Sequence, residues 1–124
     1  MAENKQYITQ NQDNGTVQIS EDVIVSIVTV AVNETEGVSG FYAKTAADLA
    51  ERLNMKSRGK GVRTTITENN DLYIECSITV AYGQPVVAVA KAVQDNVTSA
   101  VESMTGMKVA EVNVNICGIT MEQK

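Results

Sequence analysis

The side chains that usually carry out catalysis are scarce in this chain. It contains no histidine, which removes the usual general base and the commonest metal ligand. Hydrolysis by a Ser–His or Cys–His pair is therefore excluded. Ser57–Lys60 matches the S-x-x-K spacing of some serine acylases, which places Ser and Lys one helical turn apart. Gly59 and Gly61 interrupt a helix there, so we interpret this segment as a solvated loop and predict no catalytic residue and no enzymatic activity.

Motifs for cofactors and metals are equally weak. The two cysteines, Cys76 and Cys117, lie in apolar-patterned strands without a metal-ligand spacing such as C-x-x-C. Cys76 is predicted to be a small core residue, whereas Cys117 faces away from the apolar residues of its strand. Gly37–Gly40 matches the G-x-x-G of KH modules, but its middle residues are uncharged, so a chance match is the better interpretation. We expect no cofactor and no bound metal.

The clearest surface feature is a stretch of basic residues with no acidic residue among them. It contains five of the ten cations of the chain: Arg52, Lys56, Arg58, Lys60 and Arg63. A basic patch on an acidic protein can bind an anionic partner. The pattern is equally compatible with a solvated loop, so both interpretations stay open.

Composition restricts the classes of function further. The chain has 124 residues, enough for one compact domain, and its formal net charge is -5. That charge disfavours general binding to nucleic acid and simple adsorption to an anionic membrane. Aromatic residues make up only 4%, which leaves few rings for stacking on bases. We expect an intracellular, cytoplasmic protein, because there is no signal peptide, no membrane-length apolar run and no disulfide framework.

The first half of the chain has one clear helix and one ambiguous segment. Positions 1–14 are polar and are predicted to form a flexible tail. A short strand over 16–20 follows. The next segment, 23–32, is rich in β-branched residues, which favours a strand, but an acidic first turn and a helical apolar spacing slightly favour a helix. The spacing of apolar residues over 45–53 predicts an amphipathic helix.

The second half has stronger signals. Residues 62–66 and 72–82 flank a polar turn and predict a β-hairpin, with clean alternation in the second strand. Pro85 and Gly106 mark the two ends of a long helix. Its predicted buried stripe comprises Val86, Val89, Val93, Val97, Ala100 or Val101, and Met104. A last alternating strand contains Val112, Val114 and Ile116.

These elements predict an α+β fold in two layers. The expected order is β-α-(α)-β-β-α-β, with a mixed sheet of about four strands and the helices packed on one face. Residues 15–120 are expected to form a single domain, followed by a polar tail over 121–124. The segment from residue 72 to residue 118 would be a parallel strand–helix–strand crossover.

Six segments resemble the alkaline-shock, envelope-stress-response proteins of Gram-positive bacteria. They cover about residues 15 to 119 in matching order and spacing: Gly15–Ile24, Glu36–Gly40, Lys60–Arg63, Tyr82–Val86, Val93–Val97 and Met104–Gly118. The resemblance implies a helix after Ser20. It also implies a non-catalytic cytoplasmic protein linked to envelope stress and alkaline tolerance, recruited to the membrane by an integral membrane partner. Asn115 stands where relatives often carry histidine.

Two functional hypotheses follow from this resemblance and from the residues. The first is an adaptor or structural protein of the envelope stress response that acts through protein contacts, binds a protein partner and self-associates. The second is a module that binds RNA or another polyanion through the basic loop 52–63. The net charge makes nucleic acid the less favoured partner, and no direct insertion into the membrane is expected.

Overall fold

Eight elements are defined in the described part of the chain. The structure, a computed structural model, describes residues 7–42 and 61–121. The elements are β1 (Tyr7–Gln12), β2 (Gly15–Ser20), α1 (Glu21–Asn33), β3 (Val38–Phe41), β4 (Val62–Ile66), β5 (Leu72–Ala81), α3 (Val86–Thr105) and β6 (Val109–Thr120). The predicted helix over 45–53 and residues 122–124 lie outside these ranges.

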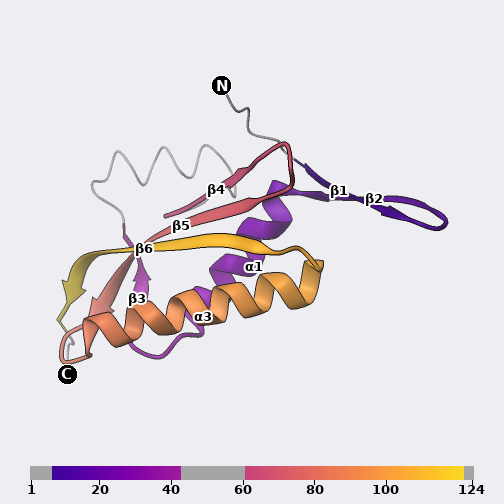
Figure 1. The fold of residues 1–124 in the computed structure, drawn as a ribbon. Coiled ribbons are helices and arrows are strands. Elements are labelled where there is room, and N and C mark those ends of the chain that lie inside the picture. Colours follow the sequence, from indigo (N-terminus) through magenta and orange to yellow (C-terminus); the bar gives the residue numbers. More distant parts are fainter. Residues whose placement is uncertain (1–6, 43–60, 122–124) are drawn as a thin grey trace.

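A mixed four-stranded sheet is built around β5 (Figure 1). β6 pairs with β5 in parallel along its whole length. On the other side of β5, β4 pairs antiparallel with Leu72–Cys76 and β3 pairs antiparallel with Ile78–Val80, so the two short strands share one edge. The predicted fold class, hairpin and parallel crossover are confirmed.

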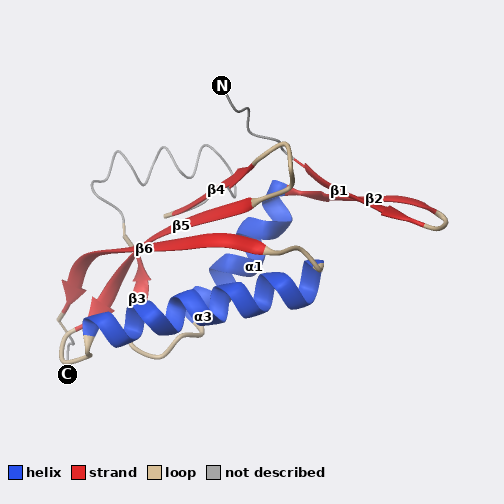
Figure 2. Cartoon of the chain, in the orientation of Figure 1, coloured by secondary structure: helices blue, strands red, loops and turns tan. Residues whose placement is uncertain are grey.

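Both described helices cover the same face of this sheet (Figure 2). The alternation of β5 places five residues in the core: Leu72, Ile74, Cys76, Ile78 and Val80. α3 buries Val89, Val93, Val97 and Val101 against them. Burial of a large aliphatic side chain contributes about 1.5–3 kcal/mol, which outweighs the weak helix propensity of valine. Neither described helix has the length and hydropathy that a bilayer-crossing segment needs.

Residues 21–33 form a helix, as the sequence slightly favoured. Glu21 and Asp22 occupy its first turn, where carboxylates interact favourably with the helix dipole. The sequence also suggests that the Ser20 side chain caps this helix, which is wrong: Ser20 is the N-cap residue, but its side chain makes no capping hydrogen bond. The Glu21 carboxylate instead accepts a hydrogen bond from the Thr64 hydroxyl of β4. This contact ties the start of α1 to the edge of the sheet.

Two further predictions require correction. The flexible tail predicted over 1–14 is wrong for residues 7–12, because they form β1 and pair antiparallel with β2. Ile8 lies fully buried opposite Ile19, and Gln10 Nε2 donates to the Thr105 carbonyl at 2.6 Å. Met104, predicted in the buried stripe of α3, is 69% exposed.

Candidate interaction surfaces

The two cysteines have opposite environments. Cys76 lies fully buried on the helix-covered face of β5. Burial raises the pKa of its thiol from 9.0 to about 12, and the nearby Glu75 carboxylate adds to this. At neutral pH Cys76 is therefore a protonated core residue, as predicted, and a poor nucleophile. Cys117 is exposed on β6. In the described ranges, no group of three or more His, Cys, Asp or Glu residues has a metal-binding arrangement.

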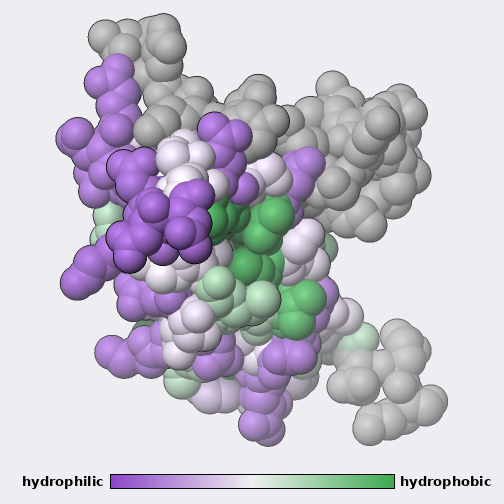
Figure 3. All heavy atoms as spheres, turned by 90° about the vertical axis from the view of Figure 1, so that its right-hand side faces the viewer, coloured by the Kyte–Doolittle hydropathy of each residue, from purple (hydrophilic) through white to green (hydrophobic). Residues whose placement is uncertain are grey.

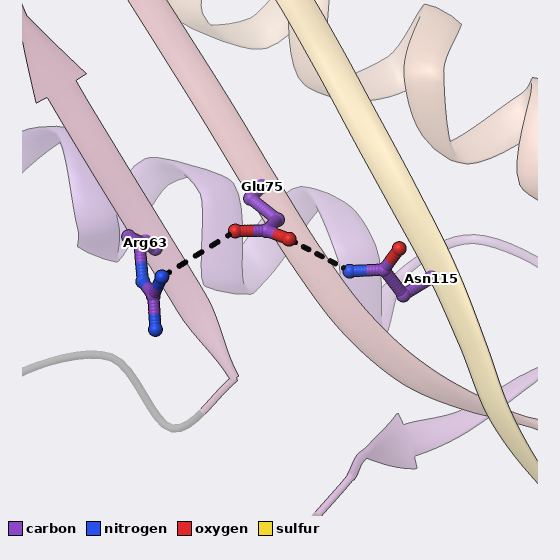
Figure 4. Close-up of polar contacts among 3 residues, drawn as sticks. All are labelled: Arg63, Glu75 and Asn115. Carbon is purple, nitrogen blue, oxygen red and sulfur yellow. Dashed lines mark hydrogen bonds and ion pairs between the residues drawn. The ribbon is translucent and has the colours of Figure 1, made fainter.

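One of the five predicted basic residues lies in the described part. Arg63 is on β4, and its Nη1 lies 3.9 Å from Oε1 of Glu75 on β5. The other oxygen of Glu75 accepts a hydrogen bond of 2.9 Å from Asn115 Nδ2 on β6, so the three side chains bridge three strands (Figure 4). The remaining four, Arg52, Lys56, Arg58 and Lys60, lie outside the described residues. Because Arg63 faces a carboxylate, its own attraction for an anion is reduced.

These three side chains lie on the open face of the sheet. Both described helices are on the opposite face. The open face carries polar side chains from the two long strands: Tyr73, Glu75, Ser77 and Thr79 from β5, and Glu111, Asn113, Asn115 and Cys117 from β6. The sequence predicted this polar side of β5 from its alternation, and the burial pattern confirms it.

A second surface is a groove between α1 and α3, with a volume of about 630 Å³. Its lining is Ser26, Ile27, Val30, Ala31 and Glu34 from α1, and Asn96, Ser99, Ala100, Ser103 and Met104 from α3. Ile27 and Ala31 are buried, whereas Val30 and Met104 are 55% and 69% exposed. Among the described residues of this lining, Glu34 is the only ionisable one. We call this surface the α1–α3 groove.

One end of the α1–α3 groove is fixed by two linked hydrogen bonds that meet at the buried Thr35 hydroxyl. Asn96 Nδ2 on α3 donates to Thr35 Oγ1 at 2.9 Å, and the Thr35 hydroxyl donates to the Ala31 carbonyl at 2.8 Å. Thr35 is buried and follows the end of α1. These two hydrogen bonds therefore set the spacing of α1 and α3 at the end of the groove where Glu34 lies.

Hydrophobic side chains also gather at the end of the molecule where the β1–β2 hairpin and the C-terminal end of α3 lie (Figure 3). The exposed apolar residues of the described part include Val17 of β2, Val23 of α1 and Met104 of α3. An exposed hydrophobic patch on a folded protein is typical of a contact surface. Neither this patch nor the groove was predicted from the sequence. The large number of apolar residues in 23–32, more than one buried helix face needs, was a signal for an exposed apolar surface.

Comparison with known proteins gives consistent matches over almost the whole chain. A sequence profile of the alkaline shock protein 23 family, described as having a cell envelope-related function, matches residues 9–121. The uncharacterized protein YqhY of Bacillus subtilis is 30% identical over 110 residues, covering 89% of this chain and 81% of that protein. An uncharacterized protein of Streptococcus pyogenes is 31% identical over 109 residues, covering 88% of this chain and 82% of its own length. A solved structure of the MamM CTD covers 82% of this chain and 95% of its own, with a TM-score of 0.47 at 14% identity, too distant to bear on function.

Proposed function

Because this chain belongs to the alkaline shock protein 23 family, we propose that it is a non-catalytic adaptor of the cell envelope that acts through protein–protein contacts. The family resemblance predicted from the sequence motifs is confirmed. The proposed role goes further than the envelope-related function of the family. It includes a stress-response setting and recruitment to the membrane by a protein partner.

The observation that carries this proposal is the α1–α3 groove. A helix layer that only covered a sheet would bury its apolar residues against that sheet. Here Val30 and Met104 border a hollow on the outer side of the layer. An apolar hollow between helices is a common site for a partner segment. The groove therefore supports a protein that binds another protein.

The charges of the described part favour the adaptor over the polyanion-binding alternative. Residues 7–42 and 61–121 contain three basic residues against eleven acidic residues. A surface of that balance repels phosphate backbones, whose binding depends on neutralisation by Lys and Arg. The basic residues of the 52–60 segment lie outside the described part, so polyanion binding enters the test as its opposing outcome.

The test is recovery of the tagged protein from gently solubilised cells, with and without alkaline stress. We expect an envelope protein to be recovered in near-equal amount. The matched variant is Arg63→Glu, which reverses one charge on the open sheet face and should leave that recovery unchanged. Recovery of nucleic acid that is lost in Arg63→Glu would overturn the adaptor role. Recovery of no protein in stoichiometric amount would overturn it as well.

A further inference from the structure

We propose that the α1–α3 groove binds an amphipathic helix of the partner protein, with apolar residues at i, i+3 or i+4, and i+7, and with a basic residue that contacts Glu34. This inference rests on the proposed adaptor function, because it names the surface and the chemistry of its partner. It can fail separately, since an adaptor could hold its partner on the open face of the sheet.

The shape of the groove fits a helix. Each wall is a helix, and the lining residues recur every three or four positions, over 26–34 in α1 and over 96–104 in α3. Nine residues of α-helix span about 12 Å, which matches two to three turns of a docked helix. A third helix packs between two others when the facing side chains allow an interaxial distance of about 8–10 Å.

The size of the lining side chains supports the same occupant. Half of the lining residues are Ser or Ala: Ser26, Ala31, Ser99, Ala100 and Ser103. Small residues let the backbone of a partner helix approach closely, and they leave room for its larger side chains. Val30 and Met104 stand at the two sides of the opening, where they would contact those side chains. The fitting partner therefore supplies bulky aliphatic residues.

Charge complementarity favours a basic partner over a second copy of this chain as the occupant of the groove. Glu34 is the only ionisable group among the described lining residues, and the described basic residues, Arg63, Lys91 and Lys108, do not line the groove. Two copies placed groove to groove would each bring a Glu34 and no compensating cation, which is unfavourable. A helix that carries Lys or Arg near one end pairs its charge with Glu34 instead. The groove thus selects a basic amphipathic helix.

The direct test uses synthetic helical peptides as probes. Each fluorescein-labelled peptide carries Leu at i, i+4 and i+7 in an Ala- and Gln-rich background, with one Lys a turn before or after the Leu face. We expect saturable binding by fluorescence anisotropy for at least one of the two peptides. Val30→Lys should weaken binding at least about tenfold, because it places a charge at an apolar contact. The control Val87→Lys changes another exposed valine, which lies in the first turns of α3 outside the groove lining, and should stay within about twofold of wild type.

A charge-swap cycle tests the contact with Glu34. Glu34→Lys should weaken binding of the better Lys peptide by about two- to fivefold, the range of an exposed ion pair. A peptide with Glu in place of that Lys should bind Glu34→Lys better than it binds wild type. Circular dichroism and thermal melts check that each variant folds. Because Val30 is exposed, Val30→Lys should have little effect on the stability of the fold.

Several results would overturn the inference. These are no binding by either peptide, equal binding of a scrambled peptide, or no difference between Val30→Lys and Val87→Lys. Concentration-dependent self-association by light scattering that Val30→Lys abolishes would assign the groove to a second copy. If the envelope partner recovered from cells is retained by Val30→Lys, the adaptor function stands and the groove assignment fails. If no partner is recovered at all, the function itself fails.

Discussion

The buried Cys76 thiol is expected to make the stability of this protein depend on alkaline pH. The side chain faces the helices from the middle of β5 and is fully buried. Its folded-state pKa is raised to about 12, mainly because burial disfavours the thiolate and secondarily because Glu75 is negative. In the unfolded chain the same thiol ionises near its ordinary value of 9.0. The unfolded state therefore releases a proton that the folded state retains.

The sign and size of the effect follow from this difference. A raised folded-state pKa means that the contribution of Cys76 to stability is fully present below about pH 9 and is lost as the pH rises toward 12. One pKa unit corresponds to about 1.4 kcal/mol, so the complete loss is about 4 kcal/mol. At pH 10, one unit above the unfolded-state pKa, the loss is about 1.4 kcal/mol.

The assay compares wild type with Cys76→Ala by urea unfolding at pH 8 and pH 10 in a reducing buffer. At pH 8 the variant should be less stable by about 1 kcal/mol, because a small cavity replaces the sulfur. Between pH 8 and pH 10 wild type should lose about 1.4 kcal/mol more than the variant, so the gap closes or reverses. The pH-dependent contributions from the rest of the chain are common to both proteins and cancel in the difference. Cys117→Ala, at an exposed site, should follow wild type.

Parallel stability curves for wild type and Cys76→Ala from pH 8 to pH 10 would refute this reasoning. Such a result would mean that the thiol ionises equally in both states, either because the region around it opens or because the thiol is hydrated. A shallower curve for Cys117→Ala than for wild type would also contradict it, since the alkaline loss would then depend on the exposed cysteine.

Two further predictions concern packing. Gly37 and Gly83 share a positive φ, +96° and +97°, but a Cβ at Gly37 would lie 2.7 Å from Val89 Cγ2, whereas a Cβ at Gly83 meets nothing within 4 Å. Gly37→Ala should therefore cost about 1–2 kcal/mol more than Gly83→Ala in urea unfolding, and equal costs would contradict the clash. Thr35→Val removes the hydroxyl that accepts a hydrogen bond from Asn96 and should lower the free energy of unfolding by about 1–3 kcal/mol. Asn96→Ala should lower it less, because Asn96 is exposed. Thermal melts that rank the two variants in the reverse order would show that Thr35 does not organise this contact.

The elements predicted most accurately are those whose signals are local. The alternation along β5 directly reports which side of the sheet is buried, and its burial pattern follows that alternation. Gly106 ends α3 in a left-handed conformation, with φ of 75°, because glycine adopts it without a steric penalty. Met104 was misplaced because the buried stripe of α3 continues from Val101 to Thr105, four residues later, and Met104 lies beside it. The apolar side chain of Met104 suggested burial, but the polar Thr105 occupies the buried position.

β1 was missed because its stability does not come from its own apolar residues. Its Thr, Gln and Asn side chains have no apolar period, and Ile8 is an apolar residue of this strand that is fully buried in the core. The strand is held by backbone pairing with β2, which is a tertiary contact that composition does not report. One local signal was present, since Asp13, Asn14 and Gly15 are turn-forming residue types, and Gln12 pairs with Gly15 across the two-residue turn of Asp13 and Asn14.

The ambiguous helix-or-strand pattern of residues 23–32 and the apolar lining of the α1–α3 groove have the same origin. α1 has more apolar residues than one buried face of a helix requires, so its sequence also fitted a strand. Ile24 and Val28 turn to the sheet and are fully buried, whereas Val23 and Val30 remain exposed on another side. The adaptor hypothesis gives the surplus valines a role, because a helix that contacts both a sheet and a partner needs two apolar faces. If that is so, Val30→Lys should abolish partner binding while leaving the fold stable, since Val30 makes its contacts outside the core.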